Sequence, residues 1–122
     1  KATKELLQEC GEKLDCYLGK LVDPNVHVGD KQFYGIKSAY MVGILGNSEV
    51  KPKLVDMLPK ITGTGARFVA VQTIDRFSPK GDAAISEKLL KMLADAEAQK
   101  DDKKVQEYSF FKQFGYRLMA RQ

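Results

Sequence analysis

Histidine and cysteine are scarce in this chain, and tryptophan is absent. The 122 residues include one histidine, His27, and two cysteines, Cys10 and Cys16. A nucleophilic serine needs a neighbouring general base, usually a histidine, and the chain has one histidine. In addition, no serine of the chain stands in a Gly-x-Ser-x-Gly context. The carboxylates lie in lysine-rich stretches, whereas a general acid needs a desolvated environment. We therefore find no catalytic constellation and expect that the chain is not an enzyme.

The two cysteines are six residues apart, which limits how they can pair. On one continuous helix they would lie about 240° apart around the axis and about 9 Å along it, too far for a disulfide. A break at Gly11 would change this geometry. We expect two small buried or half-buried thiols. The spacing of Cys10, Cys16 and His27 matches no recognised zinc motif, so no metal or other cofactor is expected.

Long apolar runs are also missing. Charged residues make up 30% of the chain and interrupt every hydrophobic stretch. A bilayer span needs roughly 20 mostly apolar residues, so we expect no membrane insertion. The length suits one domain, residues 1–122. Because the chain begins with Lys1 rather than methionine, it is interpreted as a fragment or a processed chain, and its compartment stays open.

What the sequence does contain is a pattern that occurs twice, about 32 residues apart. Residues 38–48 and 70–80 each begin with a small residue. Apolar residues follow four and seven positions after it, and the three residues share one helix face. A second apolar stripe follows each of these segments. The two stripes are Leu54, Val55, Leu58 and Ile61, and Ile85, Leu89, Met92 and Leu93. Helix pairs that repeat at a period of about 20 to 50 residues predict an α-solenoid.

The remaining patterns predict helices and almost no strand. We expect a loop at residues 23–30 and helices over residues 2–10, 12–22, 31–45, 49–61, 66–77, 83–99 and 104–120. Ser48 and Asp82 are predicted to cap the helices that follow them. The helix over residues 31–45 has apolar residues on more than one side, so we expect it to be mostly buried.

This succession of helices resembles the HEAT-repeat family, whose unit is an apolar helix, an Asp-Pro turn and a second helix that opens with a pair like Val-Arg. Residues 14–22 followed by Asp23-Pro24 resemble the first helix and its turn, and residues 66–77, which open with Ala66-Arg67, resemble the second. The resemblance implies an all-α fold, an α-α superhelix of about three antiparallel helix pairs over residues 12–120. Thr62-Gly63-Thr64-Gly65 stands in place of the Asp-Pro turn in the second pair. An irregular helical bundle is the alternative.

The positive charge of the chain leaves two functions open. A net charge of +4 would suit nucleic acid. The residues that could align along one edge are Arg67, Arg76, Lys80, Arg117 and Arg121, and the first four are the predicted nucleic-acid contacts. Acidic and basic residues alternate within single turns elsewhere, which is more typical of a solvated surface. We therefore favour a non-catalytic protein-interaction or scaffold module, with nucleic-acid binding as the alternative.

The last predicted helix concentrates aromatic residues. Five of the 11 aromatic residues of the chain lie there: Tyr108, Phe110, Phe111, Phe114 and Tyr116. Phe111 and Phe114 are expected in the core. The set is too wide for one inward stripe, so we predict that at least one of Tyr108, Phe110 and Tyr116 is exposed and contacts a protein partner or a second copy. These three and Arg67, Arg76 and Arg117 are the predicted partner-binding residues.

Overall fold

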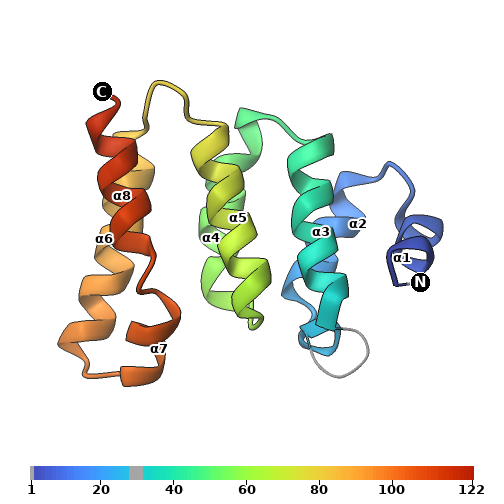
Figure 1. Ribbon diagram of the computed structural model, residues 1–122, viewed down its shortest axis with the longest axis horizontal. Coiled ribbons are helices and arrows are strands. Elements are labelled where there is room, and N and C mark those ends of the chain that lie inside the picture. Colours follow the sequence, from blue (N-terminus) through green and yellow to red (C-terminus); the bar gives the residue numbers. More distant parts are fainter. Residues whose placement is uncertain (1, 28–31) are drawn as a thin grey trace.

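The computed structural model describes residues 2–27 and 32–122, and it is built of helices (Figure 1). The α-helices are α1 (Ala2–Cys10), α2 (Leu14–Val22), α3 (Gln32–Leu45), α4 (Lys51–Met57), α5 (Thr64–Arg76), α6 (Ala83–Ala98), α7 (Asp102–Glu107) and α8 (Phe111–Ala120). Short 3-10 helices are η1 (Pro24–His27), η3 (Ser48–Val50) and η4 (Leu58–Lys60). The described part of the chain has no strand, so the all-α prediction is confirmed. Residues 28–31, which include part of the predicted loop, lie outside the described residues.

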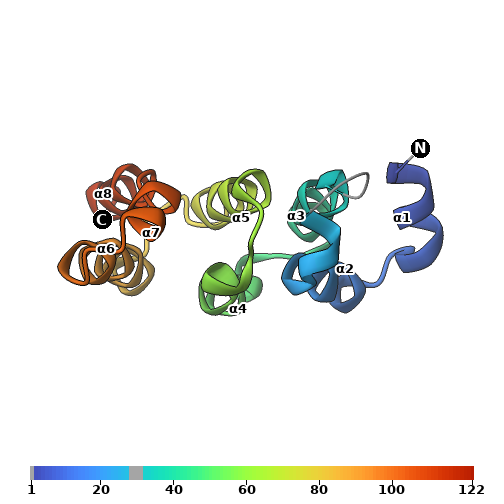
Figure 2. The ribbon, with the colours of Figure 1, turned by 90° about the horizontal axis from the view of Figure 1, so that it is seen from below.

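The helices stand side by side in a row, with α1 at the N-terminal end and α8 at the C-terminal end (Figure 1). The helix pairs are α2 with α3, α4 with α5, and α6 with α8. Seen along the helix axes, α3, α5 and α8 form one layer and α2, α4 and α6 form the other (Figure 2). Helix α3 packs against both α2 and α5, and α5 packs against α8. None of the described helices has both the length and the apolar character needed to cross a bilayer.

The core lies between the two layers. Leu54, Leu58 and Leu89 are fully buried, as the apolar stripes predict. Leu45 and Phe77, which lie seven positions after the first residue of each similar segment, are both half-buried and pack against this core. The fold therefore rests on leucine-rich stripes that face the neighbouring layer, and burial of each such side chain contributes about 1.5–3 kcal/mol.

The predicted caps have different outcomes. Asp82 is the N-cap of α6, and its carboxylate accepts a hydrogen bond of 3.1 Å from the backbone N–H of Ile85. The cap predicted at Ser48 is wrong, because Ser48 already belongs to η3. Asn47 has the extended backbone of a cap instead, and its side-chain oxygen accepts a hydrogen bond of 2.9 Å from the N–H of Glu49.

The single helix predicted over residues 104–120 is divided in two. Helix α7 ends at Glu107, and a turn at residues 108–110 leads into α8. The break lets members of the aromatic set reach different neighbours. With the turn, the rings of Tyr108 and Phe111 stack at 4.7 Å in the core, while Phe110 meets Phe68 of α5 at 5.2 Å.

The two cysteines form a disulfide, so the prediction of two thiols is wrong. Gly11 has a φ of +58°, a left-handed conformation that suits glycine, and it ends α1 so that the chain turns back. The two Cα atoms lie 5.4 Å apart as a result. Glu9, Cys10 and Cys16 are the one group at metal-ligand distances that the described residues contain, and both of its sulfurs are already bonded. The side chain of His27 lies outside what the structure describes.

The prediction that the helix over residues 31–45 is mostly buried holds for only part of its surface. In α3 the exposed fractions are 52% for Phe33, 51% for Tyr40 and 69% for Ile44. The side that packs against α2 and α5 carries smaller residues, among them Ala39 and Val42. Close packing of the helices favours these small residues, and the large apolar side chains are left on the outer surface.

Candidate protein-binding surface

Exposed large apolar side chains gather on one layer of the molecule. Apart from Leu7 in α1, all such side chains among the described residues belong to α3, α5 or α8: Phe33, Tyr40, Ile44, Phe68, Tyr116 and Met119. We call the exposed surface of these three helices the α3/α5/α8 face. Single exposed apolar residues are ordinary on proteins, whereas a concentration of them on one side is typical of an interaction surface.

The charges of the two layers differ as well. Helices α2, α4 and α6 contain five basic and five acidic residues. Helices α3, α5 and α8 contain five basic residues but one acidic residue, Asp75. The α3/α5/α8 face is therefore both aromatic and positively charged, and the opposite layer carries balanced charge.

A groove of about 530 Å³ crosses this face. Helix α5 supplies most of its lining, from Phe68 to Arg76. Tyr40 of α3 lines it on one side, and Phe114 and Arg117 of α8 line it on the other. Because the lining comes from three helices of three different pairs, the groove exists only in the stacked molecule.

Two arginines at one end of the groove are held by neighbouring groups. Arg76 is exposed, and its Nη2 donates a hydrogen bond of 2.8 Å to the backbone carbonyl of Gly43 in α3. The guanidinium of Arg117 lies 4.9 Å from the ring centre of Phe114. Its Nη1 is also 3.6 Å from Asp75 Oδ2. These contacts restrict both guanidinium groups before any ligand binds, which lowers the entropy that binding would cost.

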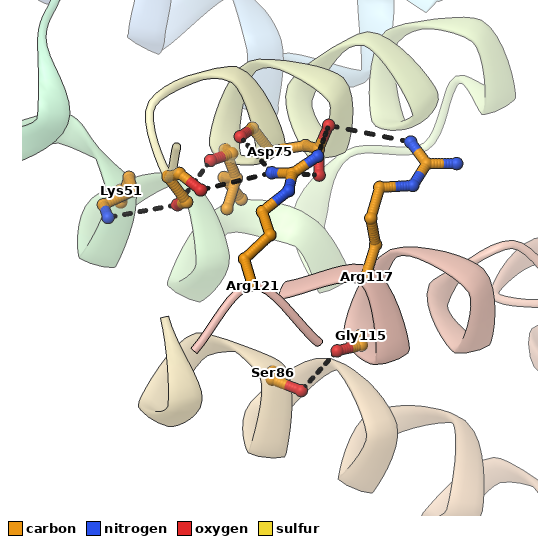
Figure 3. A network of polar contacts seen from close by, with 8 residues as sticks. Lys51, Asp75, Ser86, Gly115, Arg117 and Arg121 are labelled. Carbon is orange, nitrogen blue, oxygen red and sulfur yellow. Dashed lines mark hydrogen bonds and ion pairs between the residues drawn. The ribbon is translucent and has the colours of Figure 1, made fainter. Parts of the chain in front are cut away.

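Asp75 has a second and closer cation. Nη1 of Arg121 lies 3.0 Å from Asp75 Oδ1, and it also donates to the backbone carbonyls of Asp75 and Ser78. Figure 3 shows Arg121 and Arg117 both directed toward this one carboxylate. Two positive charges therefore face a single negative charge, and this end of the groove has an excess positive charge.

Arg67 does not belong to this surface, contrary to the prediction. Its side chain is 2% exposed, and its Nη2 donates a hydrogen bond of 2.5 Å to the carbonyl of Ile61. It also lies 3.5 Å from a carboxylate oxygen of Glu107 and 5.7 Å from the ring centre of Tyr108. Burial raises the pKa of the Tyr108 phenol, although the charge of Arg67 opposes that shift. Arg67 therefore joins α5 to the α7 region and is not available to a phosphate.

The other predicted residues lie in different environments. Tyr116 is 54% exposed, Phe110 is half-buried and Tyr108 is buried. Arg76 and Arg117 both line the groove, whereas Lys80 is exposed in the turn before α6. The sequence interpretation missed Tyr40 and Phe68 as surface residues. The spacing of Phe33, Tyr40 and Ile44 on one helix face was a usable signal, but it is the same spacing that a buried helix shows.

Similarity to known proteins gives no assignment, because neither family models nor curated proteins nor solved structures match this chain. The chemistry of the α3/α5/α8 face is therefore the guide to function.

Proposed function

We propose that this chain is a non-catalytic protein-binding scaffold, built as a HEAT-like superhelix, that binds a segment of another protein on its α3/α5/α8 face. The observation that carries the proposal is the confinement of exposed large apolar side chains to this layer, with Leu7 as the single exception among the described residues. A stack of helix pairs holds its second helices in one extended layer, and such layers serve as binding surfaces in solenoid proteins. The groove supplies a recessed site within that layer.

Nucleic acid fits this surface less well than a protein segment. Of the four cations predicted to contact phosphates, Arg67 is buried and Lys80 lies in the turn before α6, outside the groove. Binding to a polyanion depends on several free cations, each of which neutralises a phosphate. Ile44 and Met119 add exposed aliphatic surface, which is typical of protein recognition.

A peptide library tests the proposal. Random peptides of about 12 residues, displayed on phage, would be selected on the immobilised chain, since such peptides are long enough to cross three neighbouring helices. We expect enriched peptides that bind the Tyr40→Ser variant about tenfold more weakly than the unchanged chain, because a central aromatic contact contributes more than 1 kcal/mol.

Leu7→Ser is the matched control, because Leu7 is also an exposed large apolar residue but lies on α1, outside the face. The enriched peptides should bind this variant as tightly as the unchanged chain. The proposal is wrong if no peptide is enriched above a blank surface, or if both variants weaken binding equally.

A further inference from the structure

The two ends of the groove differ in chemistry. At one end the exposed Phe68 ring lies edge-on to Phe110 at 5.2 Å and to Phe114 at 5.8 Å. Tyr40 contributes a further exposed ring from α3. At the other end, where α5 ends, are Arg76 and Arg117, and Arg117 Nη1 lies there 3.6 Å from Asp75 Oδ2. An apolar side chain therefore finds partners at the aromatic end, and an anion finds them at the basic end.

We propose that the groove binds a protein segment that carries an apolar side chain and, a short distance along it, an acidic side chain. This inference rests on the proposed function and adds the chemistry of the partner. The apolar side chain packs against Tyr40 and Phe68, and the carboxylate binds between Arg76 and Arg117.

The length of α5 sets the spacing of the two side chains. Phe68 and Arg76 are eight residues apart on one helix, which corresponds to about 12 Å along its axis. An extended peptide advances about 3.3 Å per residue, so its acidic residue would follow its apolar residue by about four positions. In a helical peptide the same distance corresponds to about two turns.

The basic end keeps its shorter contacts when it accepts a carboxylate. Arg76 uses one N–H on the carbonyl of Gly43, and a guanidinium has five N–H donors. Asp75 keeps Arg121 at 3.0 Å even when Arg117, at 3.6 Å, turns to a ligand. A guanidinium binds a carboxylate in a two-pronged geometry that an ammonium group cannot reproduce.

Charge also argues against a second copy of the chain on this face. Helices α3, α5 and α8 offer Asp75 as their one acidic residue, and that carboxylate is already paired. Two copies placed face to face would bring like charges together, which is unfavourable. An acidic partner complements the face instead.

Three peptide libraries of about 12 residues test the inference. All three carry random apolar residues, and their polar positions hold Asp and Glu in the first, Asn and Gln in the second, and Lys and Arg in the third. We expect enrichment from the acidic library and little from the other two. The dissociation constants of the enriched peptides would then be measured by fluorescence anisotropy on variants of the chain.

Arg76→Gln and Arg117→Gln should each weaken binding by about 5-fold to 30-fold, as expected for a charge-assisted hydrogen bond of about 1–2 kcal/mol. Arg76→Lys should weaken it less than Arg76→Gln, because the charge is kept. Lys112→Gln is the matched control, since Lys112 is an exposed cation of α8 that does not line the groove. It should change the dissociation constant by less than about twofold.

The outcomes separate this inference from the function on which it rests. Equal enrichment from the neutral library, with no loss in the arginine variants, would overturn the acidic partner and leave the protein-binding function standing. Absence of enrichment from all three libraries would contradict both. Displacement of a bound acidic peptide by an equimolar single-stranded RNA oligonucleotide would assign the groove to nucleic acid and would also overturn the inference.

Discussion

Gly43 and Arg76 form a close contact between α3 and α5. A Cβ atom at position 43 would lie 2.5 Å from Arg76 Nη2 and 3.2 Å from Thr73 Oγ1, so the missing side chain makes room for the guanidinium. The same guanidinium donates to the Gly43 carbonyl. Packing of the two helices and the position of a candidate binding group therefore depend on one glycine.

A pair of glycine variants tests this contact. Gly43→Ala should leave the free energy of unfolding within about 1 kcal/mol of that of the unchanged chain, because the exposed Arg76 side chain can move aside at the loss of its hydrogen bond, while alanine favours the helix. Gly19→Ala in α2 is the matched control, since nothing lies within 4 Å of its added Cβ. It should instead raise the free energy of unfolding by about 0.5–1 kcal/mol, because alanine restricts the unfolded chain. Urea denaturation of both variants measures the difference, and equal effects would contradict the packing argument.

At the scale of the elements, Asp82 connects the second helix pair to the third. It caps α6, and its Oδ2 pairs at 2.9 Å with Nζ of Lys51 in α4. Lys51 also donates a hydrogen bond of 3.1 Å to Ser78 Oγ, in the turn that follows α5. Burial alone would raise the pKa of the Asp82 carboxyl. The hydrogen bonds from Lys51 and from the Ile85 N–H, with the charge of Lys51, outweigh burial and lower this pKa.

The lowered pKa of Asp82 predicts an acid-dependent loss of stability. A carboxyl whose pKa is lower in the folded state stabilises the fold above its unfolded pKa of about 3.9, and this contribution is lost as the pH falls through the folded pKa. We expect the free energy of unfolding to fall more steeply below about pH 4 in the unchanged chain than in Asp82→Asn. Because asparagine can also cap a helix, Asp82→Ala should lower the free energy of unfolding at pH 7 by about 1 kcal/mol more than Asp82→Asn does. Parallel pH profiles for the unchanged chain and Asp82→Asn would contradict this assignment.

At the scale of the whole molecule, the excess positive charge is concentrated in one layer but is not arranged as a nucleic-acid site. The chain has a net charge of +4. Among the cations of α3, α5 and α8, Arg67 is buried against Glu107, and Arg117 lies beside Asp75. The four cations other than Arg67 are Lys37, Arg76, Lys112 and Arg117. They are exposed but spread over three helices, and they are fewer than the roughly 6–10 phosphate contacts of a strongly salt-dependent DNA-binding protein.

We expect no binding to duplex DNA or single-stranded RNA tighter than about 100 µM at physiological salt, the weak limit of non-specific binding. Fluorescence anisotropy with labelled oligonucleotides measures this directly. Micromolar affinity at that salt, lost in the Arg76→Glu/Arg117→Glu double variant but kept in Lys112→Glu, would favour nucleic acid over the protein-binding proposal.

The sequence by itself determined where most helices lie, because the relevant signals are local. The apolar stripe at Leu54 and Leu58, the Asp23-Pro24 stop and the Asp82 cap each act within a few residues of their position. Their physical causes are helical periodicity, the missing N–H of proline and the unpaired N–H groups of a helix start.

The tertiary structure decided which residues form the candidate site and which are buried, because burial depends on the helices that cover each face. Arg67 and Arg76 look alike in the sequence, yet α7 and the turn after it cover Arg67, while Arg76 stays at an open groove. Cys10 and Cys16 meet only because the chain reverses at Gly11. The periodicity of Tyr40 is that of a core helix, but its side chain is exposed because α2 and α5 contact the other sides of α3.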